Sequence, residues 1–197
     1  MNKGLWILVV LGIIGAIIFF NAKGTYNSLV TSQEGVEAQW AEVENNYQRR
    51  ADLIPNLVET VKGYKDFEQE TLTGVAEARA KVGQLTVDKE VLENPELMAR
   101  FSEAQGELGS VLSRLLSVAE NYPDLKANEG FRDLRVQLEG TENRITVARN
   151  RFNETARAHN TQVKTFPNNI YANFFGFDEV SYFQSAQGSE QAPKVEF

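Results

Sequence analysis

The sequence predicts an all-α protein, with an N-terminal transmembrane helix, an antiparallel up-down four-helix bundle of long helices and an aromatic-rich C-terminal tail. An unbroken apolar segment opens the chain, heptad-spaced apolar side chains recur after it, and no strand-like alternation of useful length appears before the tail. Helices joined by short connections bury their seams best as antiparallel neighbours. We expect an anchor at residues 1–23, a helical bundle at 24–166 and a tail at 167–197.

The composition excludes much chemistry. The 197 residues include no Cys and one His, and the formal net charge is -7. Disulfides, thiol nucleophiles and Cys-ligated metals are therefore excluded, and a di-metal bundle site needs two Glu-x-x-His pairs. The single His159 follows Glu154 at the wrong spacing, and an acidic chain is a poor partner for nucleic acid. We expect no catalytic residue, cofactor, metal or nucleic acid, and thus no enzyme.

The N-terminal apolar segment predicts a membrane anchor through residues 5–22. The 19 uncharged residues between Lys3 and Lys23 reach roughly 28 Å as a helix, close to a hydrocarbon core of about 30 Å. A cleavable signal peptide is the alternative, but the one plausible cleavage site places Phe20 where a small residue is required. Positive charge ahead of the segment predicts a single pass with the domain on the non-cytoplasmic side.

Four heptad patterns predict the helices of the bundle. The first predicts one long helix from Tyr26 to about Tyr64, kinked at Pro55, that begins afresh or continues from the anchor. The second covers about 66–84. The third begins at an N-cap, Asn94, with a proline as first helical residue, and stops at 122–123.

The last heptad pattern spans residues 131–162, and its second half turns polar. Thr155, His159 and Gln162 occupy positions where the first half carries mostly apolar side chains. A histidine in such a seam is interpreted as a core or interface imidazole, with a ligand or pH sensor as the alternative. Phe166-Pro167 is expected to end this helix, because the residue before proline disfavours the helical conformation.

Arg49, Arg50 and Asp52 form the most distinctive polar group, since Arg50 falls on the apolar seam of the first helix. A buried guanidinium needs carboxylate partners. Candidate partners are Glu139 and Glu142 on the last helix, or Glu103 and Glu107 on the third. We interpret the group as a structural network, with a partner-binding patch and a catalytic group as alternatives.

The tail is unlike a solvated linker, because residues 165–197 hold eight of the chain's 20 aromatic residues. The tail can fold back on the bundle, lie at a bilayer interface or bind a neighbouring subunit. We interpret the C-terminal end as disordered or docked on a subunit, and its final apolar side chain and free carboxylate suit a carboxylate-capturing partner as the alternative. The candidate interaction residues are Arg49, Arg50, Asp52, Trp40, Tyr47, Phe174, Phe175, Phe177 and Phe197.

Residues 40–64, WAEVENNYQRRADLIPNLVETVKGY, carry the longest match to a known family. With the segments 77–79, 121–127, 139–149, 166–169, 175–177 and 193–197, the chain resembles the LemA family of bacterial membrane proteins over nearly its whole length. The resemblance implies a single N-terminal transmembrane helix, a soluble helical bundle and no established biochemical activity. Where the family commonly has a histidine, this chain has Phe67.

These observations together predict a non-enzymatic helical scaffold that self-associates at the bacterial inner membrane. Surplus apolar and aromatic side chains on the anchor, the first helix and the tail favour a homo-oligomer. The alternative is an adaptor that recruits a membrane peptidase or an envelope-stress partner through the bundle face or the C-terminus.

Overall fold

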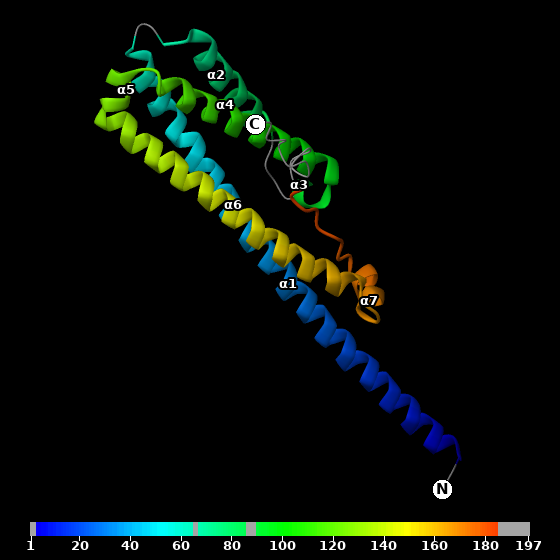
Figure 1. The fold of residues 1–197 in the computed structure, drawn as a ribbon. Helices are drawn as coiled ribbons and strands as arrows, with labels where there is room; N and C mark the ends of the chain where they lie inside the picture. Colours follow the sequence, from blue (N-terminus) through cyan, green and yellow to red (C-terminus); the bar gives the residue numbers. More distant parts are fainter. Residues whose placement is uncertain (1–2, 65–66, 86–89, 185–197) are drawn as a thin grey trace, which may run out of the picture.

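The computed structural model describes residues 3–64, 67–85 and 90–184. Every regular element in these ranges is a helix (Figure 1). The helices are α1 (Lys3–Lys62), α2 (Gln69–Gly83), α3 (Glu90–Glu93), α4 (Pro95–Ala119), α5 (Pro123–Ala127), α6 (Glu129–Lys164) and α7 (Asn168–Phe175). The all-helical class expected from the sequence is thus confirmed for the described residues.

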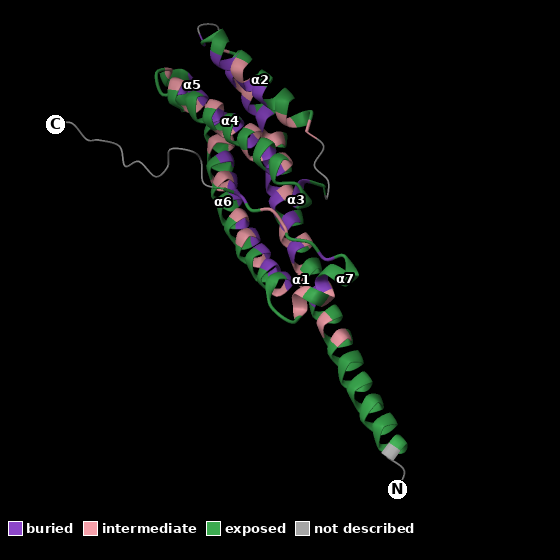
Figure 2. Ribbon diagram, turned by 90° about the vertical axis from the view of Figure 1, so that its right-hand side faces the viewer, coloured by how far each residue is buried: buried purple, intermediate pink, exposed green. Residues whose placement is uncertain are grey.

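Helix α1 carries the apolar segment and the first heptad seam in one continuous element of 60 residues. The anchor and the first helix of the domain are therefore joined without a break, and Pro55 lies inside the helix without ending it. The N-terminal part of α1 projects from the rest of the chain, with its side chains exposed (Figure 2). It is long and apolar enough to cross a membrane.

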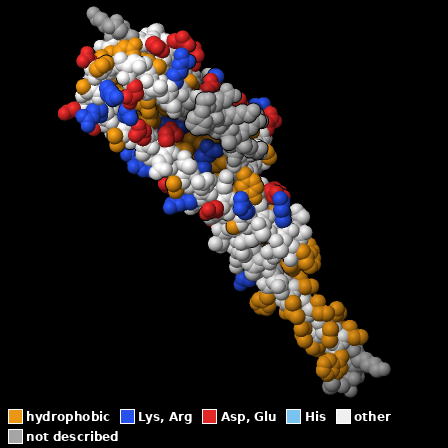
Figure 3. Space-filling model, viewed as in Figure 1, with side chains coloured by type: hydrophobic (Ala, Val, Ile, Leu, Met, Phe, Trp, Pro, Cys, Tyr) orange, Lys and Arg blue, Asp and Glu red, His pale blue; other side chains and the backbone are white. Residues whose placement is uncertain are grey.

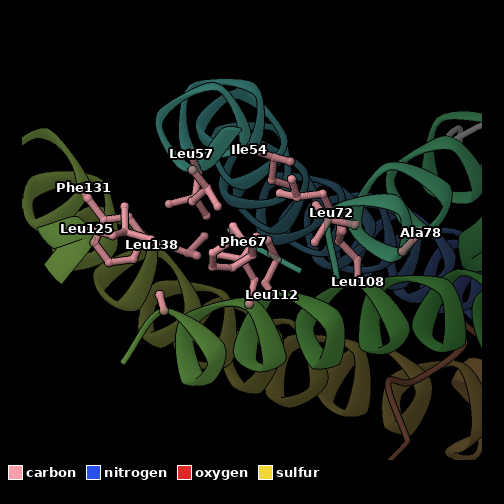
Figure 4. Packing of buried hydrophobic residues seen from close by; sticks show 14 residues of the cluster. Ile54, Leu57, Phe67, Leu72, Ala78, Leu108, Leu112, Leu125, Phe131 and Leu138 are labelled. Atoms are coloured by element: carbon pink, nitrogen blue, oxygen red, sulfur yellow. The ribbon is translucent and has the colours of Figure 1, made fainter. Parts of the chain in front are cut away.

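Helices α6 and α7 pack against the C-terminal two-thirds of α1. Helix α6 lies along α1, and α2 lies along α4 (Figures 1 and 2). One apolar cluster joins all four of these helices, and Ile54, Leu72, Leu112 and Leu138 each contribute a side chain from a different helix (Figure 4). Phe67 belongs to this cluster and packs on the ring of Tyr122 at 5.2 Å. The domain therefore has a shared core rather than two separate helix pairs.

The ends of two helices follow from local capping. The Asn94 side chain accepts hydrogen bonds from the backbone N–H of Glu96 and Leu97, at 2.9 and 3.3 Å, and Pro95 is the first residue of α4, as expected. Asn128 caps α6 by accepting from the N–H of Phe131 at 3.0 Å. The short helices α3, α5 and α7 were not expected, because each has too few residues for a heptad pattern.

The buried face of α6 differs from the expected seam in its second half. The seam predicted Thr155 and Gln162, which are both half-buried in the structure, and the buried residues there are Ala156, Asn160 and Val163. An α-helix with 3.6 residues per turn drifts relative to a strict seven-residue repeat, so the buried face moves by one position over several turns. His159 is buried in both descriptions.

Candidate functional site

Arg50 lies at the centre of a buried polar network that connects three helices. Its side chain is 2% exposed. One terminal nitrogen donates to Oε1 of Glu142 on α6 at 2.9 Å, and the other donates to the backbone carbonyl of Gln105 on α4 at 3.1 Å and to the side-chain oxygen of the same residue. The Tyr47 ring lies 5.0 Å from the guanidinium carbon. Charge-assisted bonds of this kind fix α1, α4 and α6 relative to one another.

The carboxylate partner of Arg50 is one of the four that the sequence proposed. Glu139 pairs instead with Arg135 at 2.9 Å, and Glu107 pairs with Lys81 on α2 at 2.7 Å. The two other members of the predicted polar group do not join the network. Arg49 and Asp52 are exposed, and Asp52 accepts a hydrogen bond from Gln48 at 2.8 Å. The structure therefore separates Arg50, a core residue, from the two charges beside it.

The phenol of Tyr47 shares this environment. Burial raises the pKa of Tyr47 above its ordinary value of 10.0, and the positive charges of Arg149 and Arg50 oppose the increase. Because its side chain is 6% exposed, the ring is part of the core.

Trp40 packs among aromatic rings that come from α4, α6 and the tail. Its ring is 5.5 Å from Phe101 and from Phe152, and it stacks on Phe183 at 5.8 Å. Phe183 belongs to the segment after α7 and is 6% exposed. Trp40 and Tyr47, proposed as interaction residues, therefore make intramolecular contacts.

Residues 176–184, which we call the strap, run along the surface formed by α1, α3 and α6. Two asparagine side chains of α6 bind the backbone of the strap, and each bonds both the N–H and the carbonyl of one strap residue. The Asn160 side chain donates to the carbonyl of Val180 and accepts from its N–H, both at 2.8 Å. The Asn153 side chain does the same with Phe183, both at 3.0 Å. Each amide side chain thus replaces the partner that a neighbouring β-strand would provide.

Further contacts hold the strap at both ends. His159 is 1% exposed, and its ring nitrogens lie 3.3 Å from the Ser32 hydroxyl and 3.1 Å from the carbonyl oxygen of Asp178. Lys164 pairs with Glu179 at 2.6 Å. The Ser181 N–H donates to the carbonyl of Leu92 in α3 at 2.8 Å, and the Arg149 guanidinium lies 4.6 Å from the Phe183 ring centre. The strap therefore folds back on the helices, which was one of the three expected outcomes for the tail.

The strap contacts were missed at the level of sequence. Asn153 and Asn160 are seven residues apart and so lie near one face of α6. The available signal is the change of the last heptad pattern from apolar to polar residues, of which His159 is one. This change alone does not indicate that the partner is an extended backbone.

The tail residues proposed for interaction have different environments. Phe177 is 8% exposed and packs with Leu29, whereas Phe174 is 80% exposed and Phe175 is 40% exposed. The ring of Phe175 lies 4.9 Å from Tyr26 on α1. Phe197 lies outside the described residues.

Within the described ranges, no three His, Asp or Glu side chains are grouped as a metal ion would require. A hollow of about 510 Å³ forms an open groove between α2 and α4. Residues that line this groove include Gln69, Glu70, Thr73, Glu77, Val111 and Arg114. The buried Arg50 side chain joins three helices, and His159 and Asn160 hold the strap on α6.

Fold and site together define a class: all-helical proteins whose first helix is a candidate membrane span, continuous with a domain closed by a strap. The LemA family model matches residues 39–197, and this chain belongs to the LemA family. The family expected from the sequence is thus confirmed.

Two kinds of relatives share most of this chain. It is 26% identical to Protein LemA of Metamycoplasma hominis, over 95% of this chain and 81% of that protein. It is 25% identical to Magnetosome protein MamQ 2 of Paramagnetospirillum magneticum, over 90% of this chain and 71% of that protein. Magnetosome protein MamQ of Magnetospirillum gryphiswaldense is also 25% identical, over 80% of this chain and 64% of that protein. These relatives and the apolar part of α1 indicate a membrane-associated protein.

Proposed function

We propose that this protein is a non-enzymatic scaffold anchored in the bacterial inner membrane through residues 5–22, with its helical domain on the non-cytoplasmic side. The observation that carries the proposal is the continuity of α1. One helix of 60 residues contains both the apolar segment and one side of the domain core. Any association of the apolar segments in the bilayer is therefore transmitted to the domain without a flexible linker.

Within this proposal, α1, α2, α4 and α6 form an antiparallel up-down four-helix bundle. The apolar cluster shared by the four helices supports it. So does the course of the chain in Figure 1, in which consecutive long helices run in opposite directions.

Self-association is proposed to run through the apolar part of α1. Gly12 and Ala16 are four residues apart, and small residues at this spacing let two helices approach closely in lipid. A Cβ added at Gly12 would meet nothing within 4 Å in this chain, so the position is open to a second helix. Trp40 and Tyr47, which also suggested assembly, are buried and contribute to the core instead.

The test is native mass spectrometry of the full-length protein released from lipid nanodiscs. We expect a homo-oligomer that dissociates when Gly12→Ile and Ala16→Ile are combined. The control enlarges side chains on the opposite face of the same helix, with Val10→Phe and Ile14→Phe, and should leave the oligomer intact. A monomeric wild-type protein would refute the proposal. If both pairs of substitutions dissociate the oligomer equally, the assembly does not run through the face of Gly12 and Ala16.

The alternative is an adaptor that recruits a membrane peptidase or an envelope-stress partner through its bundle face or its C-terminus. The open groove between α2 and α4 favours it, since Glu70 and Glu77 line a hollow of about 510 Å³ beside Arg114. A cross-linker placed at Glu77 should then capture one heterologous membrane protein in cells, and Glu77→Lys should abolish its co-purification. Capture of another copy of this chain would favour the scaffold.

A further inference from the structure

The membrane-proximal end of the domain carries an apolar face that the described chain does not cover. Phe166 is 76% exposed, Ile170 is 57% exposed and Phe174 is 80% exposed. Ile170 and Phe174 are four residues apart on α7 and so share one face of it, and Phe166 is exposed in the turn just before the helix. On the opposite side, Ala172 is fully buried against α1. Helix α7 thus has one apolar side buried against α1 and a second apolar side that is exposed.

The position of α7 along α1 places this face beside the membrane. Tyr26 contacts the ring of Phe175 at 4.9 Å and that of Phe177 at 5.7 Å. Tyr26 follows Ala22, the last residue of the anchor, by four residues, or roughly 6 Å along a helix. A headgroup layer is about 5–8 Å thick, so α7 lies at the depth where amphipathic helices insert.

Two aromatic residues of α1 support the same register. Trp6 and Tyr26 are exposed, at 52% and 41%, and they are twenty residues apart, or roughly 30 Å along the helix. Trp and Tyr are enriched in the interfacial layers on either side of the hydrocarbon core, and core and interfacial layers together measure about 40–45 Å. Tyr26 is therefore an interface residue in this register, and α7 is held against it.

The charges of this end agree with a lipid surface. Residues 24–33 of α1 and 165–177 around α7 contain no charged side chain, although the chain carries 27 acidic residues. The charged groups that flank them are Lys23 and Lys164 on one side, and Glu34 and Asp178 on the other. Figure 3 shows orange side chains over α7, next to the orange N-terminal part of α1. The domain thus excludes acidic groups from the surface that an anionic leaflet would approach.

We propose that α7 is an interfacial helix, whose outer face of Phe166, Ile170 and Phe174 inserts into the leaflet from which α1 emerges. The occupant of the face is the lipid bilayer. The domain is then fixed to the membrane at two points, α1 and α7, and cannot pivot freely about α1. The inference rests on the anchoring of α1 proposed above but not on self-association.

The absence of Cys allows a direct test in the full chain. Phe174→Cys and, as the matched control, Val136→Cys carry a nitroxide label in vesicles of phosphatidylethanolamine and phosphatidylglycerol. Val136 is 67% exposed near the other end of α6. We expect the ratio of collisions with oxygen to collisions with a water-soluble nickel chelate to be several-fold higher at position 174 than at position 136. Equal ratios at the two positions would overturn the proposal.

A second copy of this chain is the competing occupant, and the same experiment detects it. Protection of position 174 from both reagents, with spin–spin broadening that disappears on dilution by unlabelled protein, would overturn the proposal in favour of a protein interface.

A second measurement does not depend on the label. Phe174→Glu should increase amide hydrogen exchange of α7 in vesicles several-fold, whereas Val136→Glu should leave it unchanged. Lipid exposure at position 174 in a monomeric protein would support this inference and refute only self-association.

Discussion

Asn160 should control the docking of the strap. Its side chain, 2% exposed, makes two hydrogen bonds to the backbone of Val180 and a third, at 2.9 Å, to the hydroxyl of Tyr182. Asn160→Ala leaves the N–H and carbonyl of Val180 without these partners. A buried unpaired group costs about 1–3 kcal/mol, and since Val180 is half-buried, water replaces part of the loss. We expect a total effect of about 2 kcal/mol on strap docking.

The assay is amide hydrogen exchange of the full-length protein in lipid nanodiscs. A loss of about 2 kcal/mol makes the Val180 amide exchange roughly 30 times faster, because about 1.4 kcal/mol corresponds to a factor of ten. If strap docking is coupled to global unfolding, the melting temperature falls by roughly 4–8 °C for a chain of this size.

The matched control is Asn150→Ala. Asn150 lies on the same helix but is exposed, so the substitution has the same effect on helix propensity without touching the strap. We expect its exchange rates to match those of the wild type and its stability to change by less than about 0.5 kcal/mol. The reasoning is refuted if Val180 exchanges equally fast in the two variants.

Four further substitutions test the buried network and the aromatic cluster. Glu142→Ala removes the carboxylate of a 2%-exposed guanidinium and should destabilise the protein by about 2 kcal/mol in urea unfolding, while Arg50→Met in the same background restores most of it; no recovery would contradict this. Phe183→Ala removes a ring stacked on Trp40 and should cost about 3 kcal/mol, and a smaller loss than 1 kcal/mol would show that the strap is not part of the core. Burial raises the pKa of Tyr47, so the unfolded chain loses this proton first as the pH rises past about 10, and stability falls until the folded value is passed. Tyr47→Phe should show a shallower loss of stability above that pH, and identical slopes would contradict the assignment.

The heptad reasoning predicted α1 best, because its seam faces other helices along its whole length. The buried residues Val36, Val43, Ile54 and Leu57 all lie on the predicted seam, and so does Arg50. The position of Arg50 also predicted the kind of partner it has, because a guanidinium on an apolar seam requires a carboxylate. Glu142 was among the four candidates. Which of the four it would be depended on helix register, which spacing alone does not determine.

The short elements show where periodicity loses its information. Helix α3 has four residues and α5 has five, so neither completes enough turns to display a stripe. Helix α7 has eight residues, and its exposed face is as apolar as its buried face. A stripe cannot be identified when both sides of a helix are apolar, and this is the reason why the sequence left three environments open for the tail.

The polar second half of α6 has a physical explanation that also accounts for the error in its seam. Where α6 faces α1 and α4, its partners are side chains, and apolar residues such as Ile145 and Phe152 suffice. Where the strap lies on it, the partner is an extended backbone with N–H and carbonyl groups that need hydrogen bonds even at a buried contact. Asn153 and Asn160 each offer a donor and an acceptor in one side chain and satisfy both groups of a single residue. The polar residues that bind the strap are therefore His159 on the predicted seam and Asn153 and Asn160 beside it, and they mark a change of partner from a helix to an extended segment rather than the end of the core.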